Sequence, residues 1–143
     1  MQPTMTTESL EDYIYQVFPE LMDGEVRPYL VTDLAPATAS LTMRVSTRHQ
    51  RPGGTVSGPA MMALADLALY AVILGHIGKV PLAVTTSLNF NFLRKPDIGD
   101  LTGSAKLLKL GKRLAVGEVD IASERGGDVV AHATGTFSIP PNR

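Results

Sequence analysis

Hydrophobic and polar residues follow two different periods along this chain. Apolar residues recur at helical spacing between residues 10 and 18, and Thr7 or Ser9 can cap the segment, which predicts a short helix over about residues 7–22. A second stretch, over residues 59–77, is apolar almost throughout, with Gly58 and Pro59 at its start and Gly78 at its end. It predicts one long helix that is buried on every side.

The other segments are typical of β-strands. Apolar and polar residues alternate over 38–45, 82–92 and 129–139, and two further strands over 101–108 and 114–121 flank a turn at Gly111. The first strand, over about 26–32, contains Pro28, so we expect it to lie at a sheet edge or to start late.

The order of these elements predicts the fold. One flat sheet cannot cover a helix on every face, whereas a strongly curved antiparallel sheet can wrap around it, with a second subunit closing the assembly. We therefore predict an α+β fold, a curved antiparallel sheet around a long central helix. Without repeats or a linker, the chain is expected to form a single domain over residues 1–143, with a core at about 25–140.

Composition narrows the classes of function. The 143 residues are 44% hydrophobic and 19% charged with a net charge of −1, which fits one compact domain and gives no electrostatic basis for binding nucleic acid. The absence of cysteine removes disulfides and thiolate chemistry, and three separated histidines give no metal-ligand spacing. We therefore expect no bound metal. The N-terminus has no export signal, so we expect a cytoplasmic protein.

Asp66 is the one acidic residue in the apolar stretch 59–77, and no Lys or Arg accompanies it there. Burying an unpaired carboxylate is costly, so the group needs donors from elsewhere or a changed protonation state. The stretch is almost long enough to span a membrane, but the central acid and the flanking strand patterns disfavour that interpretation. Asp66 is therefore a candidate functional group, the simpler alternative being a buried acid bonded to the backbone or a hydroxyl.

The segment GGTVSGPAMMALAD resembles the signature of the hotdog thioesterases, specifically the PaaI-like acyl-CoA thioesterase branch. SLNFNFLRKP, LKLGKRLAVGEVDI and VVAHATGTFSI extend the resemblance over about residues 45–139. It implies a hotdog fold and hydrolysis of an acyl-CoA thioester to a free acid and CoA. Coenzyme A is then part of the substrate, and no separate cofactor is implied.

The resemblance also implies roles for individual residues. Asp66 matches the acid that activates water or attacks the thioester carbonyl directly, and Thr85 matches a hydroxyl that orients the water. The Gly58 N–H matches the oxyanion donor, which agrees with the free N–H groups and positive dipole of a helix N-terminus. In this family the acid and the oxyanion donor come from opposite subunits, so a homodimer, or a dimer of such dimers, is implied.

Three positions depart from the family pattern. Arg51 stands where an Asn is common, and Ser57 and Pro59 replace the His and second Gly of His-Gly-Gly. Because Pro59 has no N–H, Gly58 becomes the more exclusive oxyanion donor. Arg51 can still donate hydrogen bonds, and His49 or Gln50 of the same loop are alternatives. Whether this variant keeps full activity is open at this stage.

Substrate-binding candidates lie in the same loop, on the helix and in two cationic segments. Met62 is a candidate for lining an acyl pocket, and the cations can meet the CoA phosphates. The full set is Ser57, Met62, Phe92, Leu93, Arg94, Lys95, Lys109, Gly111, Lys112 and Arg113. For the charged members the simpler alternative is a solvated loop or hairpin charge.

Two other functions remain open from the sequence. One is a hotdog enoyl-CoA hydratase or dehydratase, which would pair an acid with a histidine such as His49 or His76. The other is a non-catalytic acyl-CoA binder, which the altered Ser57–Pro59 turn allows. The identity and length of the acyl chain, dimer against tetramer, and Asp66 as base against nucleophile are also open.

Overall fold

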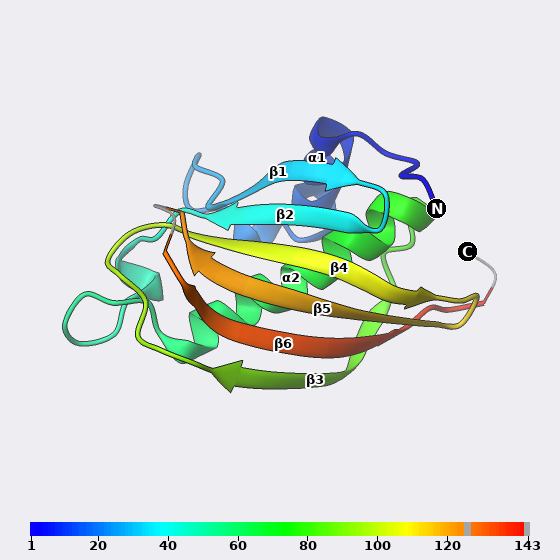
Figure 1. Ribbon diagram of the computed structural model, residues 1–143. Helices are drawn as coiled ribbons and strands as arrows, with labels where there is room; N and C mark the ends of the chain where they lie inside the picture. The colour runs from blue at the N-terminus through cyan, green and yellow to red at the C-terminus, as the bar shows by residue number, and fades with distance from the viewer. Residues whose placement is uncertain (125–126, 142–143) are drawn as a thin grey trace.

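The structure, a computed structural model, describes residues 1–124 and 127–141 (Figure 1). Within these residues, two helices and six strands make up the fold, with two short 3-10 helices between them. In chain order they are α1 (Thr7–Val17), η1 (Pro19–Leu21), β1 (Tyr29–Ala35), β2 (Thr38–Met43), η2 (Thr47–His49), α2 (Gly58–Ile77), β3 (Val84–Phe92), β4 (Leu101–Leu110), β5 (Leu114–Ser123) and β6 (Val129–Ser138).

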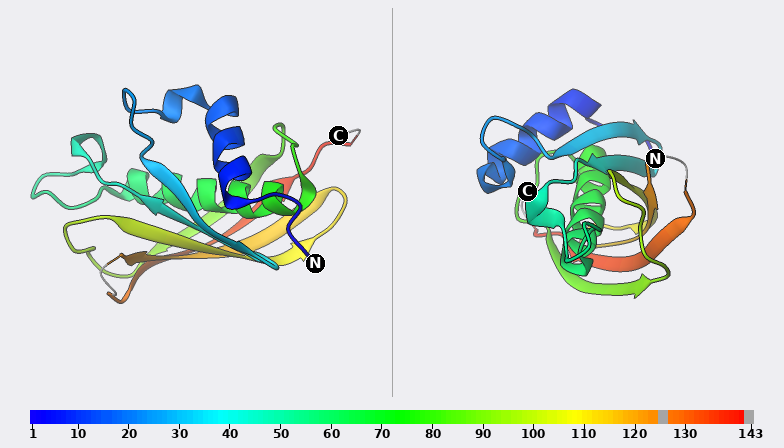
Figure 2. Two further views of the ribbon diagram at one scale, coloured as in Figure 1. Left: turned by 90° about the horizontal axis from the view of Figure 1, so that it is seen from above. Right: turned by 90° about the vertical axis from the view of Figure 1, so that its left-hand side faces the viewer.

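The six strands form one antiparallel sheet in the order β1-β2-β4-β5-β6-β3. The sheet curls around α2, which lies along its concave face (Figure 2). Along β4, β5 and β6, buried residues alternate with more exposed ones, because successive side chains point to opposite faces of the sheet. The predicted α+β fold, a curved sheet around a long central helix, is confirmed.

Helix α2 begins at a side-chain cap and packs deep into the sheet. The Ser57 hydroxyl accepts the Ala60 N–H at 3.2 Å, and Pro59 occupies the first turn, where a missing N–H costs nothing. Gly117 and Gly135, paired across β5 and β6, leave room for Leu69 of the helix: a Cβ on either glycine would lie 2.7 or 2.6 Å from the Leu69 side chain. By length and composition α2 could cross a membrane, but 67% of its apolar window is buried inside the fold.

One stripe of α2 is uncovered in the single chain. The predicted burial on every side includes a second subunit and therefore stays a prediction. Pro59, Met62 and Ala63 are exposed, and Asp66 and Leu67 are half-buried. The sheet covers the opposite side of the helix, while the N-terminal segment covers only its C-terminal half, where the rings of Phe18 and Tyr70 meet edge-on at 5.4 Å. The stripe is the surface on which the rest of the site lies.

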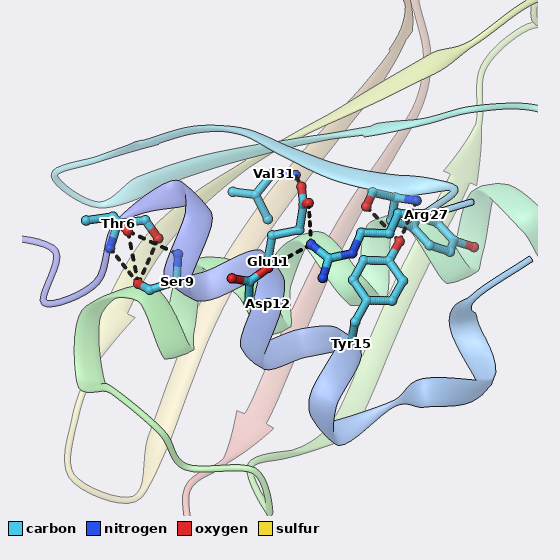
Figure 3. A network of polar contacts seen from close by, with 8 residues as sticks. Thr6, Ser9, Glu11, Asp12, Tyr15, Arg27 and Val31 are labelled. Carbon is cyan, nitrogen blue, oxygen red and sulfur yellow. Dashed lines mark hydrogen bonds and ion pairs between the residues drawn. The ribbon is translucent and has the colours of Figure 1, made fainter. Parts of the chain in front are cut away.

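Helix α1 closes the outer edge of β1 with side chains (Figure 3). The Tyr15 hydroxyl accepts the Tyr29 N–H at 2.8 Å and donates to the Tyr29 carbonyl at 2.7 Å, and Glu11 accepts the Val31 N–H at 2.8 Å. Arg27 holds Glu11 in place through an ion pair of 2.9 Å. Burial raises the pKa of Tyr15 to about 12, so the phenol stays neutral and can serve as both donor and acceptor. The outer backbone groups of Tyr29 and the Val31 N–H thereby have partners, whereas β3 is the other edge of the sheet and has no such helix beside it among the described residues.

The boundaries of the elements differ from the predicted ones by a few residues. The predicted helix over 7–22 ends at Val17, and Pro19 starts the separate η1 turn, because proline has no N–H and clashes with a preceding helical turn. Strand β1 begins directly after Pro28 and lies at the sheet edge, as that proline predicts.

Replacing Tyr15 by Phe tests the edge closure. The variant leaves the Tyr29 N–H and carbonyl without their partner, so we expect the free energy of unfolding to fall by about 2 kcal/mol. Urea unfolding followed by circular dichroism measures the loss. Tyr13→Phe on the same helix is the matched control, because no hydrogen bond of the Tyr13 hydroxyl is present among the described residues. Equal stability of the two variants would contradict this account of α1.

Candidate functional site

Asp66 of α2 meets Thr85 of β3 at the uncovered side of the helix. The Thr85 hydroxyl donates to the Asp66 carboxylate at 2.5 Å, and within the described part of the chain Asp66 forms no ion pair. A bulge between Thr85 and Ser87 interrupts the pairing of β3 with β6 at this point, and bulges re-aim side chains near functional sites. The sequence predicts that Asp66 needs a hydrogen-bond donor from elsewhere in the chain, and in the structure this donor is a hydroxyl rather than a cation.

These two residues line a cavity of about 320 Å³, here called the Asp66 cavity. It lies between the two edges of the curled sheet and under the N-terminal segment, and its wall is mostly apolar. Its lining residues are Phe18, Leu21, Tyr29, Ala63, Asp66, Leu67, Tyr70, Ala83, Val84, Thr85 and Phe137. An apolar cavity with a few convergent polar groups has the general form of a small-molecule site.

A second cavity of about 540 Å³, the Gly58 cavity, lies at the N-terminus of α2. Its wall joins the loop before the helix to the segment after β3, and it collects half of the predicted substrate-binding residues. Its lining residues are Arg51, Val56, Ser57, Gly58, Pro59, Met61, Phe92, Leu93, Arg94, Lys95 and Pro96. Backbone N–H, apolar and cationic groups thus share one concave surface.

The Gly58 N–H is available to a ligand. The Ser57 hydroxyl accepts a hydrogen bond from the Ala60 N–H, and the Ser57 carbonyl accepts one from the Met61 N–H. Pro59 has no N–H. Among the described residues no acceptor is bonded to the Gly58 N–H, which leaves one free donor in the first turn at the positive end of the helix dipole. A Cβ on Gly58 would lie 3.2 Å from the Phe92 ring, so the ring packs directly against this backbone.

A buried histidine holds the loop that positions Gly58. His49 Nδ1 accepts the Ser46 N–H at 3.0 Å, and the His49 carbonyl accepts the Ser57 N–H at 2.8 Å. Burial lowers the pKa of His49, and the nearby Arg48 charge lowers it further. The neutral imidazole is therefore part of the scaffold. Arg51 is exposed at the rim of the Gly58 cavity and does not line the Asp66 cavity.

The structure separates some of the predicted site residues. Gly58 and Asp66 are two turns apart on one helix, about 12 Å along its axis, and line different cavities. The hairpin residues Lys109, Gly111, Lys112 and Arg113 lie at the far end of β4 and β5 from the Gly58 cavity and line neither cavity (Figure 1). Met62 is exposed on the α2 stripe between the two cavities.

Arg94 of the Gly58 cavity has an alternative partner. Its guanidinium pairs with Asp128 at 3.0 Å, and both side chains are exposed. An exposed pair of this kind is weak, so an anionic ligand can compete for the arginine.

Several residues of the Asp66 cavity have no signal in the sequence. Phe18 and Leu21 belong to the N-terminal segment, which the pattern predicted only as a helix, and Tyr29 follows the strand-breaking Pro28. Their spacing is that of ordinary core residues. Only the packing of this segment against α2 brings them beside Asp66.

The other two histidines have structural roles. His76 is buried, and its Nε2 accepts the Ala37 N–H at 2.9 Å, which ties the end of α2 to the turn between β1 and β2. His132 pairs with Asp120 at 2.7 Å on the outside of the sheet. No group of side chains able to hold a metal is found within residues 1–124 and 127–141.

Comparison with known proteins establishes the class. Residues 53–130 match the family model of the thioesterase superfamily, and the fold is that of the hotdog thioesterases. A Pseudomonas aeruginosa protein named as a putative esterase is 30% identical over 115 residues, which cover 79% of this chain and 84% of that protein. The chain belongs to the thioesterase superfamily, whose reaction is the hydrolysis of thioesters.

Two solved structures define its relatives more closely. A putative thioesterase from Silicibacter sp. TM1040 superposes with a TM-score of 0.89 at 44% identity, over 99% of this chain and 96% of that one. A mutant of the phenylacetic acid degradation protein PaaI from Thermus thermophilus gives a TM-score of 0.67 at 30% identity, over 78% and 93%. The resemblance to PaaI-like hotdog thioesterases is confirmed.

The depressed pKa of His49 predicts how stability depends on pH. In the unfolded chain His49 titrates near 6.5, and in the folded chain at lower pH, so the unfolded state binds more protons as pH falls through this range. The stabilising contribution of His49 is therefore complete above the unfolded value and falls as the solution is acidified.

Acidification from about pH 7.5 to about pH 5.5 should lower the free energy of unfolding of His49→Asn less than that of the wild type. Asn keeps an acceptor for the Ser46 N–H but does not titrate. Urea unfolding at both pH values measures the two losses, and the other histidines contribute equally to both proteins. A variant as acid-sensitive as the wild type would contradict the role of His49.

Proposed function

We propose that this protein hydrolyses acyl-CoA thioesters, with Asp66 activating the attacking water. The observation that carries the proposal is the Asp66 carboxylate, held by the Thr85 hydroxyl on the wall of an apolar cavity and free of any ion pair among the described residues. A carboxylate in such surroundings can take a proton from water during attack on a carbonyl carbon. Thr85 acts as a positioning residue that orients the carboxylate.

The chemical step needs two groups at one carbonyl. As the water oxygen bonds to the thioester carbon, Asp66 takes its proton, and the carbonyl oxygen becomes an oxyanion that a free N–H can stabilise. Collapse of the tetrahedral intermediate breaks the C–S bond, and the departing CoA thiolate takes the proton from Asp66, which restores the carboxylate. The Gly58 N–H is suited to the oxyanion because it is unpaired at a helix N-terminus.

One chain alone cannot bring these two groups together. Both must lie about 3 Å from the reacting atoms, whereas Gly58 and Asp66 are separated by about 12 Å of helix. A two-fold axis perpendicular to α2, passing between the two residues, would place the partner's Gly58 beside Asp66. We therefore infer a homodimer with two sites, each built from both subunits.

The surface of the chain favours such a dimer. The exposed stripe of α2 joins the two cavities, and the open edge of β3 runs beside Asp66 and carries exposed Val84 and Phe92. The opposite edge, β1, is closed by α1. Association along β3 would pair its free backbone groups and cover the stripe together.

The cationic rim of the Gly58 cavity suits the phosphates of CoA. Arg51, Arg94 and Lys95 line this cavity, and an arginine guanidinium can bind a phosphate through two parallel hydrogen bonds. Phe92 and Leu93 give the same wall an apolar surface for the pantetheine arm. Lys109, Lys112 and Arg113 lie too far from this cavity within one chain, so a role for them would require another subunit.

The hydratase alternative has less support. It needs a histidine beside the acid, yet neither His49 nor His76 lines the Asp66 cavity, and both are engaged in holding backbone groups. An ultraviolet assay of enoyl-CoA hydration separates the two activities.

The proposal predicts that Asp66→Asn lowers kcat about 10²–10⁴-fold, because the amide cannot accept the proton of water. A panel of acyl-CoA substrates with a thiol reagent measures the released CoA. Asp33→Asn is the matched control, since Asp33 is exposed on β1 and outside both cavities. Full turnover by Asp66→Asn would exclude Asp66 as the catalytic acid residue, and a wild type that binds acyl-CoA without releasing thiol would be a non-catalytic binder.

Single turnover in ¹⁸O-water tests whether Asp66 acts as a base. Label that enters the Asp66 carboxylate would show that Asp66 is the nucleophile instead.

A second prediction concerns the oxyanion donor. The double variant Gly58→Pro with Pro59→Ala moves the missing N–H from position 59 to position 58 and keeps one proline in the first turn. Ser57 already has the extended conformation that a following proline requires (φ −72°, ψ 155°). We expect a loss of about 10²–10³-fold in kcat, while Pro59→Ala alone keeps the Gly58 N–H and most of the activity.

Mixing the double variant with Asp66→Asn tests the shared site. After exchange of subunits, half of the dimers contain one intact site, so activity should recover to about a quarter of the wild-type value. If each site belonged to one chain, mixing would restore nothing.

A further inference from the structure

Tyr29 is a lining residue of the Asp66 cavity whose backbone is held by another tyrosine. It is 7% exposed, and its N–H and carbonyl are both bonded to the Tyr15 hydroxyl. Among the described residues no hydrogen bond to the Tyr29 hydroxyl is found. In the described part of the chain, the side-chain polar atoms that are fully buried and lack a hydrogen-bond partner belong to Thr55 and Ser123. The Tyr29 hydroxyl is not among them, so it has some accessible surface.

The other polar groups of this cavity are already engaged. The Tyr70 hydroxyl donates to the Pro81 carbonyl at 3.2 Å, and the Thr85 hydroxyl donates to Asp66. The remaining lining residues are apolar. Tyr29 is therefore the lining group with an unused hydrogen-bond donor away from the reacting carboxylate.

Its surroundings favour an oxygen acceptor. Burial raises the pKa of Tyr29, which keeps the phenol protonated as a donor, although the nearby Arg48 charge acts in the opposite direction. Arg48 is anchored by a hydrogen bond of 3.1 Å to the carbonyl of Leu21, another lining residue of the cavity. The positive charge near this end of the cavity stabilises a partly negative oxygen there.

The position of Tyr29 defines the part of a substrate that it would meet. Tyr29 is on β1 and Thr85 on β3, the two opposite edges of the sheet, so they stand on different walls of the cavity. An acyl group that extended from a thioester carbonyl at Asp66 and Thr85 toward Tyr29 would pass through the part of the cavity lined by Phe18, Leu21 and Leu67.

We propose that Tyr29 is a specificity-determining residue that selects acyl groups carrying a hydroxyl or carbonyl oxygen at their far end. The inference rests on the proposed acyl-CoA hydrolysis and adds the chemical class of the acyl group. An acyl group that is apolar throughout would leave the buried phenol without a partner, which disfavours its binding relative to an oxygenated group of the same size.

Matched substrate pairs test this selection. Each pair consists of a straight-chain acyl-CoA, from butanoyl to decanoyl, and the analogue in which the terminal methyl is replaced by hydroxyl. The measured quantity is the ratio of kcat/KM for the hydroxylated member to that for its partner. For the chain length that reaches Tyr29, we expect Tyr29→Phe to lower this ratio about tenfold relative to wild type.

Tyr70→Phe is the control, because it makes the same chemical change in the same cavity at a hydroxyl already bonded to Pro81. It should alter both members of a pair equally and leave the ratio unchanged. A ratio that Tyr29→Phe leaves unaltered at every chain length, or that Tyr70→Phe lowers as much, would overturn the proposal. Absence of thiol release from every substrate in the wild type would instead refute the proposed hydrolase function.

Discussion

The fit of α2 into the concave face of the sheet is the constraint on which the other features depend. Leu69 of the helix occupies space that side chains on Gly117 and Gly135 would fill, so the helix axis lies close to β5 and β6. Close approach allows the sheet to curl around one side of the helix and bury an apolar surface without voids. The same geometry leaves the opposite side of α2 uncovered, and both cavities open along that side.

The N-terminal segment determines what happens to the uncovered side. Through Tyr15 and Glu11, α1 binds backbone groups at the start of β1, and through Phe18 and Leu21 the segment lines the Asp66 cavity. A sheet with one closed edge and one open edge has a single direction in which to add strands. One packed segment thus influences both the direction of association and the shape of the cavity beside the acid.

The polar groups of the site are few, and defined contacts position the acid and the loop before Gly58. The Asp66 carboxylate accepts one hydrogen bond from a hydroxyl, and Gly58 keeps one free N–H. The neutral His49 fixes the loop before Gly58. In an apolar cavity such contacts are stronger than in water, because the local dielectric constant is lower. Arg51, Arg94 and Lys95 line the neighbouring Gly58 cavity, where they can attract a phosphate without neutralising the acid.

The sequence by itself determined the order and type of the elements, because apolar periodicity follows directly from which face of a helix or strand is buried. It also singled out Asp66 and Gly58, since a lone acid and a proline-flanked helix start are visible as local patterns. Only the tertiary structure decided that Thr85 bonds to Asp66, that Arg51 and Arg94 share a cavity with Gly58, and that Tyr29 lines the same cavity as Asp66. These contacts join segments far apart in the chain, and their distances depend on sheet curvature and helix packing, which no local pattern encodes.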